Sequence, residues 1–285
     1  EETFWAGGPH NNLNPKGRYA LDNIRQLVFN DKFAEAQKMI DENFNTPQNG
    51  MRFLPFGNVI LNFNYKPGAS LPLVGDGGKL YYRDLNIENA TSTVRYKVGE
   101  VEYTRTAFAS LADDVIVMRI EASKKKALSF SLSYDCPEAL QPQVSVKGAQ
   151  LTMRCNGVEQ EGIPSALNAE CLITIKADGK VKAVAAEGNG SKLTVNDATA
   201  ATIYIIGATN FVNYHDVSGN AAKRCEAMMN KALKKSYKQL FADHTEKYCE
   251  QFGRVEIDIP MTKASEAETD VRVKNFNQSD DLNLI

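Results

Sequence analysis

Between residues 51 and 211, apolar and polar side chains alternate in short segments that have the two-residue period of β-strands. The expected strands cover residues 59–63, 93–98, 101–105, 115–120, 128–133, 150–155, 169–175, 192–195 and 201–206. Turns rich in glycine, asparagine and aspartate separate these segments, and no helical pattern interrupts them. This arrangement is typical of antiparallel sheets stacked face to face. We therefore predict a mainly β fold, a large antiparallel β-sandwich of the supersandwich type.

Helical periodicity occurs on both sides of this strand-rich region. Near the amino terminus, two short helices are expected over about residues 18–44, because Ala20, Ile24 and Leu27 share one helical face and a similar spacing follows. Residues 220–252 have the same period and predict linker helices near the carboxyl terminus.

Beyond these helices, Arg254–Ile259 alternates like one more strand, and residues 262–280 have the polar, weakly patterned composition of a linker. We predict two domains: residues 1–215 form the β-sandwich domain with its two helices, and residues 216–285 form a helical linker that leads into another domain. The first residues read as the middle of a strand and the last as the first turn of a helix, so we expect a piece of a larger protein.

Composition narrows the function classes. The 285 residues carry a formal net charge of -2, whereas a protein that binds nucleic acid needs a basic face to replace phosphate counterions. No apolar run approaches the roughly 20 residues that span a bilayer, so no membrane insertion is expected. The five cysteines are widely spaced and odd in number, which indicates neither a disulfide framework nor a zinc site. We expect Cys171, Cys225 and Cys249 to be small core residues.

The titratable residues form no recognisable catalytic group in the sequence. His10, His215 and His244 are the only histidines, and they lie in three different parts of the chain. No nucleophile elbow, metal-ligand spacing or isolated pair of carboxylates is present. We therefore predict no catalytic residue, no metal and no cofactor in this chain.

The run from Trp5 to His10 is the most distinctive local feature. It contains the only tryptophan, then Gly7 and Gly8, which can adopt φ > 0, and then Pro9, whose φ is fixed. An aromatic side chain beside a turn is a common way to contact a sugar, although a lone tryptophan is more often a core residue. We predict that Trp5, Gly7, Gly8, Pro9 and His10 bind substrate or form a domain interface.

A second candidate segment, Arg52–Asn58, has its proline and glycine just before a strand, and we predict the same role for Arg52 and Asn58.

Together, several segments resemble glycoside hydrolase family 95, which comprises α-L-fucosidases and relatives that act on α-L-galactosides. The matching segments are Thr3–His10, Ile24–Ala36, Leu54–Asn58, Tyr103–Ser110, Ala208–Tyr214, Tyr237–His244 and Phe252–Val255. They follow the family order over nearly the whole chain. Asn58, Phe56 and Thr106 stand where the family usually has Asp, Leu and Glu.

The resemblance implies that this chain is the amino-terminal β-sandwich domain and linker of an inverting glycosidase. In the family, the catalytic Glu, Asn and Asp residues lie in a following (α/α)6 barrel, and none of those motifs occurs here. The implied partners are that barrel and a glycan substrate. The implied location is periplasmic or secreted.

Two alternatives remain open from the sequence. One is a stand-alone carbohydrate-binding β-sandwich without catalysis. The other is the β-domain of a different barrel hydrolase or of a phosphorylase.

Overall fold

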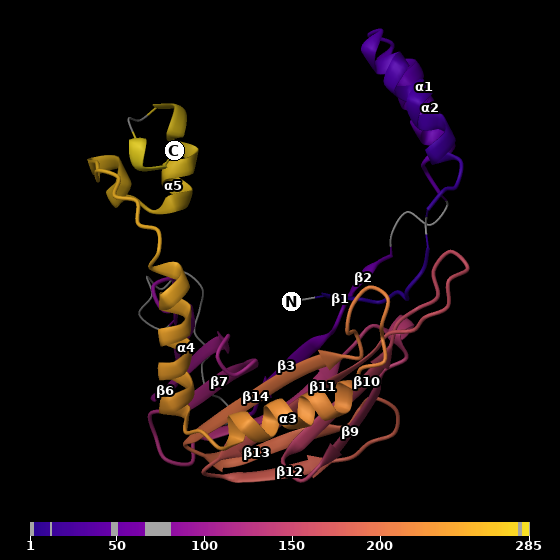
Figure 1. The fold of residues 1–285 in the computed structure, drawn as a ribbon. Helices are drawn as coiled ribbons and strands as arrows, with labels where there is room; N and C mark the ends of the chain where they lie inside the picture. Colours follow the sequence, from indigo (N-terminus) through magenta and orange to yellow (C-terminus); the bar gives the residue numbers. More distant parts are fainter. Residues whose placement is uncertain (1–2, 12, 47–50, 66–80, 279–280, 285) are drawn as a thin grey trace.

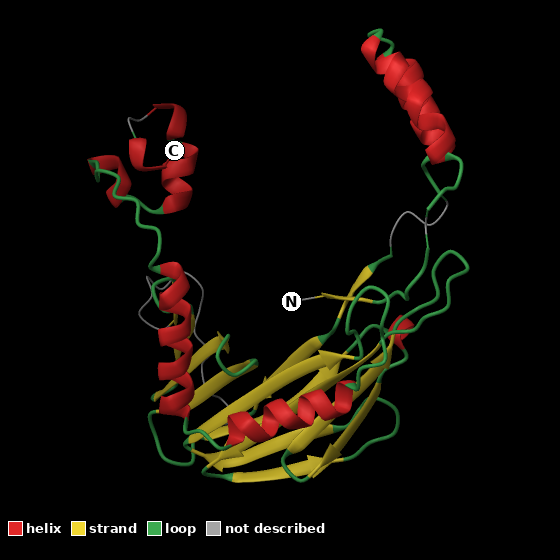
Figure 2. Ribbon diagram, in the orientation of Figure 1, coloured by secondary structure: helices red, strands yellow, loops and turns green. Residues whose placement is uncertain are grey.

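The computed structural model describes residues 3–11, 13–46, 51–65, 81–278 and 281–284, and shows a β-sandwich with helices beside it (Figures 1 and 2). The strands are β1 (Thr3–Trp5), β2 (Phe53–Pro55), β3 (Asn58–Phe63), β4 (Tyr81–Asn86), β5 (Thr91–Val98), β6 (Val101–Ser110), β7 (Val115–Ala122), β8 (Leu128–Asp135), β9 (Gln143–Lys147), β10 (Gln150–Asn156), β11 (Asn168–Ala177), β12 (Lys180–Val184), β13 (Lys192–Ala198) and β14 (Ala200–Thr209). The α-helices are α1 (Gly17–Phe29), α2 (Phe33–Asn43), α3 (Ala221–Leu233), α4 (Tyr237–Phe252) and α5 (Thr269–Lys274).

Two antiparallel sheets form the sandwich. The larger one has the strand order β4-β5-β6-β7-β14-β11-β10-β9, and the smaller one has the order β12-β13-β8-β3. A separate two-stranded ribbon joins β1 to β2. The predicted fold class is therefore confirmed, including the two helices near the amino terminus and the helices near the carboxyl terminus.

The main core lies between the two sheets. Alternate side chains of the strands point into it, and β8 shows the pattern most clearly, because Leu128, Phe130 and Leu132 are fully buried while the serines between them are partly exposed. Ile173 of β11 and Leu193 of β13 belong to the same core. This is the two-residue period on which the sequence prediction depends.

A second apolar layer covers the outer face of the large sheet. Helix α3 lies across that face (Figure 1), and its Cys225 and Met229 pack with Leu172 and Ile206 of the sheet. Strand β11 is consequently buried on both faces from Ala169 to Ile175. Because α3 and the small sheet cover opposite faces, the large sheet is the middle layer of the domain.

Some elements differ from the sequence prediction. Arg254–Ile259 is a turn followed by irregular chain that pairs with no strand of the described chain, and its apolar side chains are exposed. Strands β4, β9 and β12 were not expected, since their side chains are mostly polar or exposed. Cys249 is exposed, so its assignment to the core was wrong, whereas Cys171 and Cys225 are buried as expected.

Helices α1 and α2 form a hairpin that projects away from the sandwich (Figure 1). Ala20 and Ile24 of α1 pack against Ala36 of α2 in a small cluster of their own. At the base of the hairpin, the Asn14 side chain donates a hydrogen bond to the Asn45 carbonyl oxygen over 3.0 Å.

Candidate functional site

The structure brings the Trp5–His10 run next to the Arg52 segment. In the β1–β2 ribbon Trp5 lies opposite Phe53, and the Ala6 amide donates to the Arg52 carbonyl oxygen over 3.1 Å. On its other side, the Ala6 carbonyl oxygen accepts from the Val158 amide over 3.0 Å. The run is thus held between two segments that are distant in the sequence.

Close packing explains the two glycines of this run. A Cβ atom on Gly8 would lie 2.9 Å from the Pro164 carbonyl oxygen and 3.2 Å from the Ala166 Cβ. A Cβ atom on Gly7 would collide with the side chain of Met51. Neither glycine is among the residues with positive φ, so the conformational freedom of glycine is not used at these two positions. They are small because other chain segments approach them.

Trp5 is half-buried rather than displayed on the surface. Its ring meets Phe211 edge-on, with 5.8 Å between the ring centroids and 87° between the planes. Pro9 and His10 are also partly buried, and Nδ1 of His10 lies 3.1 Å from the Gly8 carbonyl oxygen. This geometry favours an interface or loop-fixing role for Trp5 over that of an open stacking platform.

Two buried amides, which sequence reasoning missed, fix the surrounding loops. The Gln160 Oε1 accepts from the Arg52 amide over 2.7 Å, while its Nε2 has no hydrogen-bond partner among the residues that the structure describes. The Asn210 side chain accepts from the Asn168 amide at 2.8 Å and donates to the carbonyl oxygens of Ala166 and Val217 at 3.0 and 2.8 Å. The sequence signal for Asn210 was its position, because it is a polar residue directly after the long apolar strand β14.

Asn58, the last of the candidate residues, lies elsewhere. It begins β3 opposite Asp135 in the small sheet, whereas Trp5 and Arg52 lie in or beside the β1–β2 ribbon. The structure therefore unites Trp5, Gly7, Gly8 and Arg52 but places Asn58 in a different sheet.

A cavity of about 500 Å³ opens beside β3. It is lined mostly by apolar groups of both sheets, among them Phe56, Val59, Tyr134, Cys171 and Gly207. Burial raises the pKa of Cys171 to about 12 and raises the pKa of Tyr134 as well. Burial therefore disfavours the thiolate and the phenolate, which are the nucleophilic forms of these two groups, at neutral pH.

The carboxyl groups with shifted pKa values also lack the character of a general acid. Hydrogen bonds lower the pKa of four of them. The Lys124 side chain bonds to Glu100 and the Ala200 amide to Asp178. The Ser218 side chain bonds to Asp216 and the Arg272 side chain to Asp281. A general acid at neutral pH needs a raised pKa. Within the described residues, no group of three or more His, Cys, Asp or Glu side chains is placed to hold a metal ion.

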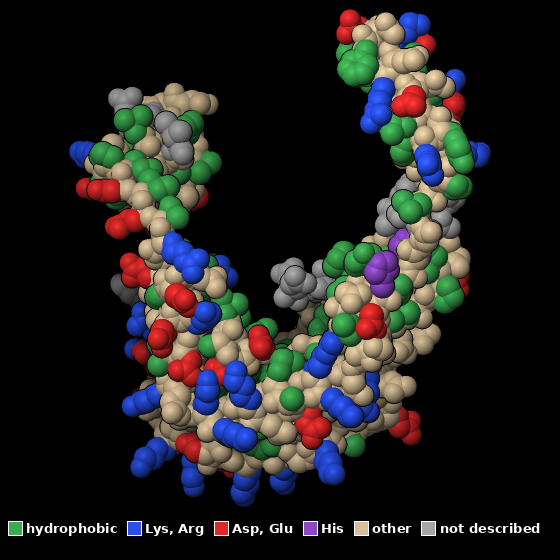
Figure 3. Space-filling model, in the orientation of Figure 1, with side chains coloured by type: hydrophobic (Ala, Val, Ile, Leu, Met, Phe, Trp, Pro, Cys, Tyr) green, Lys and Arg blue, Asp and Glu red, His purple; other side chains and the backbone are tan. Residues whose placement is uncertain are grey.

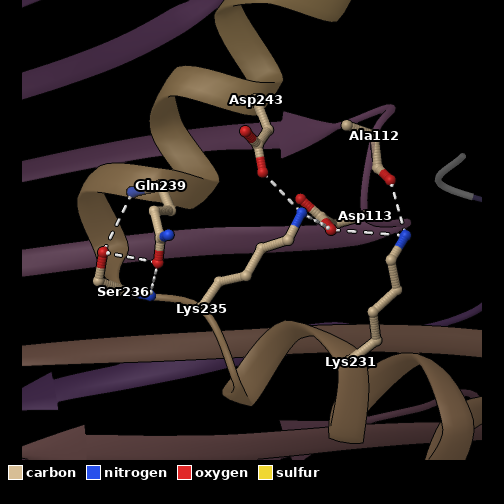
Figure 4. A network of polar contacts seen from close by, with 7 residues as sticks. All are labelled: Ala112, Asp113, Lys231, Lys235, Ser236, Gln239 and Asp243. Carbon is tan, nitrogen blue, oxygen red and sulfur yellow. Dashed lines mark hydrogen bonds and ion pairs between the residues drawn. The ribbon is translucent and has the colours of Figure 1, made fainter.

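An ionic network attaches the two long carboxyl-terminal helices to the sandwich (Figure 4). The Lys235 Nζ lies 2.6 Å from Asp113 Oδ1 and 2.6 Å from Asp243 Oδ2. Asp113 lies in the β6–β7 turn and is fully buried, and the Lys231 Nζ lies 3.5 Å from it. Both carboxylates raise the pKa of Lys235, and the Asp113 hydrogen bond has the larger effect.

His244 is a packing residue of α4. Its ring stacks on Phe108 with 4.8 Å between centroids, and Nε2 lies 2.9 Å from the Asn89 carbonyl oxygen. The side chain is 1% exposed. The structure thus explains this histidine by its contacts with the sandwich.

The comparison with known families assigns the chain. Residues 1–214 match the family model described as glycosyl hydrolase family 65, N-terminal domain. The chain belongs to this family of glycoside hydrolase N-terminal domains. α-L-Fucosidase 2 from Arabidopsis thaliana is 26% identical over 312 residues, which cover 100% of this chain and 36% of that protein. The chain therefore spans about a third of its curated relative.

Two solved structures resemble this glycoside hydrolase domain more distantly. A putative kojibiose phosphorylase from the human microbiome has 9% identity and a TM-score of 0.46, over 69% of this chain and 28% of that chain. A family GH92 inverting mannosidase from Bacteroides thetaiotaomicron has 11% identity and a TM-score of 0.40, over 90% and 33% respectively. Scores this low carry no argument, so the assignment rests on the two sequence matches.

These matches confirm the amino-terminal domain of an α-L-fucosidase-like glycoside hydrolase that the motifs indicated. The substrate-binding or interface role of Trp5, Gly7, Gly8, Pro9, His10, Arg52 and Asn58 stays a prediction. Within the described part of the glycoside hydrolase domain, no helix is both long and apolar enough to cross a membrane.

Proposed function

We propose that this chain is the non-catalytic amino-terminal domain of an enzyme that removes terminal α-L-fucosyl, or α-L-galactosyl, residues from glycans with inversion of configuration. The alignment of the whole chain with α-L-fucosidase 2 carries this proposal. The enzyme would act in the periplasm or outside the cell, as the resemblance to family 95 implies.

In this proposal the chemistry belongs to a following (α/α)6 barrel, and the sandwich supports that barrel. The domain boundaries remain those predicted, 1–215 for the sandwich and 216–285 for the helical linker and the start of the barrel. Helices α3 and α4 suit the linker role because the Asp113–Lys235–Asp243 network and the Phe108–His244 stack fix them firmly to the large sheet. The Trp5–Gly8 run and Arg52 would lie near the rim of the active site.

An assay with an aryl α-L-fucoside tests the proposal. The 285-residue chain alone should release no aryl alcohol, and the full-length protein should release it together with β-L-fucose as the first product, detected by NMR. Hydrolysis by the chain alone, or retention of configuration, would contradict the proposal. Release that requires inorganic phosphate would instead indicate a phosphorylase.

A stand-alone carbohydrate-binding role is the weaker alternative. It requires an exposed aromatic platform, whereas Trp5 is half-buried against Phe211. Binding of fucosylated glycans by the isolated chain, lost in Trp5→Ala with the fold intact, would favour this alternative.

A further inference from the structure

The α1–α2 hairpin exposes large apolar side chains. Tyr19 and Phe29 are each 83% exposed and Phe33 is 61% exposed, with Leu21 and Val28 also on the surface. We call Val28, Phe29 and Phe33, which lie at the turn between the two helices, the hairpin surface. A soluble protein rarely leaves such a concentration of apolar side chains without a partner.

The hairpin also has little to stabilise it alone. Its helices have 13 and 11 residues, neither begins with a side-chain cap, and their shared core consists of a few small or medium side chains. Isolated helices shorter than about 12–15 residues are marginal in water. Contact with another folded body would supply the missing apolar burial.

A second apolar segment rises from the same side of the sandwich. Residues 252–261, which we call the carboxyl-terminal arm, expose Val255, Ile257 and Met261 to 76%, 78% and 71%. Figure 1 shows the arm and the hairpin on opposite flanks of the same side, and Figure 3 shows the molecule hollowed between them. One folded body between the two can cover both.

The charges of the hairpin favour a protein partner. Arg25 pairs with Asp22, Lys32 with Glu35 and Lys38 with Glu42, at N–O distances of 3.5, 3.3 and 3.9 Å. Because residues 13–46 contain five Lys or Arg and five Asp or Glu side chains, the hairpin has no net charge that would attract nucleic acid or an anionic membrane. The exposed apolar side chains of the hairpin are therefore the groups that would bind a protein partner.

The length of the relative indicates which partner contacts the hairpin surface. The match covers all of this chain but only 36% of α-L-fucosidase 2, so that protein has a large further portion. Intramolecular contact benefits from a high effective concentration, which a second copy lacks.

We propose that the hairpin surface docks on the catalytic domain of the same longer polypeptide, and that the hairpin and the carboxyl-terminal arm hold this domain from two flanks. The proposal rests on the proposed function only in requiring that a catalytic domain follows. In this proposal the hairpin is an interdomain clamp, and its function lies in contact with the catalytic domain rather than with the sandwich.

Hydrogen exchange measured on the 285-residue chain and on the full-length protein tests the clamp. The amides of α1 and α2 should exchange about 100-fold more slowly in the full-length protein. In that protein, the double variant Phe29→Ser with Phe33→Ser should lose most of this protection. The matched double variant Asp22→Ser with Glu35→Ser, on the same helices, should keep it.

Equal exchange rates in the two proteins would overturn the clamp. So would protection that disappears on dilution together with a dimer seen by sedimentation, because the occupant would then be a second copy. Absence of fucosidase activity with a protected hairpin would refute the proposed activity but not the clamp, so the two failures are distinguishable.

Discussion

At the scale of single residues, Gly8 illustrates how a short motif can arise from packing. Its backbone passes so close to Pro164 and Ala166 that a side chain has no room. Glycine is therefore required here because two segments about 150 positions apart in the sequence pass close to each other.

Gly8→Ala should lower the free energy of unfolding by about 1–3 kcal/mol, because the added methyl group meets a backbone oxygen that cannot rotate away. Urea unfolding followed by circular dichroism measures the change. Gly190→Ala, in an exposed loop where Cβ meets Ala186 at 3.3 Å, is the control and should change stability by less than about 0.5 kcal/mol. Equal stability of the two variants would contradict the packing explanation.

Asn210→Ala should destabilise the chain by about 2–3 kcal/mol, since it leaves the Asn168 amide and the carbonyl oxygens of Ala166 and Val217 without their partner. The loops beside Trp5 should also exchange their amide hydrogens faster. Asn213→Ala removes one exposed hydrogen bond, to the His215 amide, and should cost under about 1 kcal/mol. If Asn210→Ala proves as mild as this control, Asn210 does not organise the loops.

The sequence could single out Trp5 and the two glycines, because their residue types are rare and specialised. It could not group them with Arg52 and separate them from Asn58, since that depends on which strands pair. The hydrogen-bond partners of Gln160 and Asn210 could not be predicted for a similar reason. An isolated amide has no pattern, and only the folded chain shows that its hydrogen-bond partners come from distant loops.

At the scale of secondary-structure elements, the α3–α4 corner is held by both a charge network and a helix cap. Ser236 begins α4 with a capping box in which its side chain accepts from the Gln239 amide (Figure 4). Directly before it, Lys235 joins Asp113 of the sandwich to Asp243 of α4. The corner therefore fixes the direction in which α4 leaves the sandwich.

Lys235→Met should lower the free energy of unfolding by about 2–3 kcal/mol at neutral pH, because it leaves the buried Asp113 carboxylate without its nearest cation. Lys234→Met, at an exposed neighbouring position, is the control and should change stability by less than about 0.5 kcal/mol. A mild effect of Lys235→Met would show that Lys231 alone compensates Asp113.

The same ion pair predicts a pH dependence. The folded state raises the pKa of Lys235 above its ordinary 10.5, so it binds this proton more tightly than the unfolded state. The stabilisation is complete below the unfolded pKa and is lost as pH rises through the folded pKa. Urea unfolding between about pH 9 and about pH 12 should therefore bring the wild type and Lys235→Met closer in stability. A constant difference over this window would contradict the pair.

The periodic elements were predictable where burial follows the period. Strand β8 alternates strictly and was found, as were α3 and α4 with their apolar faces. Strands β4 and β12 are mostly exposed, so Tyr81–Asn86 lacks the alternation and Lys180–Val184 shows it over too few residues to predict a strand. The reverse holds for Arg254–Ile259, whose alternation does not create a strand because no neighbouring strand pairs with it in the described chain.

At the scale of the whole molecule, the sandwich and the hairpin have separate cores. The sandwich core lies between its sheets, while the hairpin core is confined to α1 and α2. Sequence periodicity predicted both elements but not their separation, because it gives the apolar face of a helix without telling what covers that face. Because the cores are separate, loss of the hairpin should affect stability differently in the 285-residue chain and in the full-length protein.

In the 285-residue chain, replacing residues 13–46 with a short Gly-Ser segment should change the stability of the sandwich by less than about 0.5 kcal/mol, because within the described chain the core cluster of the hairpin contains only residues of α1 and α2. The β1–β2 ribbon and the Ala6 hydrogen bonds lie outside the replaced segment. They hold together the two segments of chain that flank the hairpin. In the full-length protein, the same replacement should lower the thermal midpoint, since it removes the proposed contact with the catalytic domain. Differential scanning calorimetry of both pairs measures the contrast. A large loss already in the short chain would mean that the hairpin stabilises the sandwich itself.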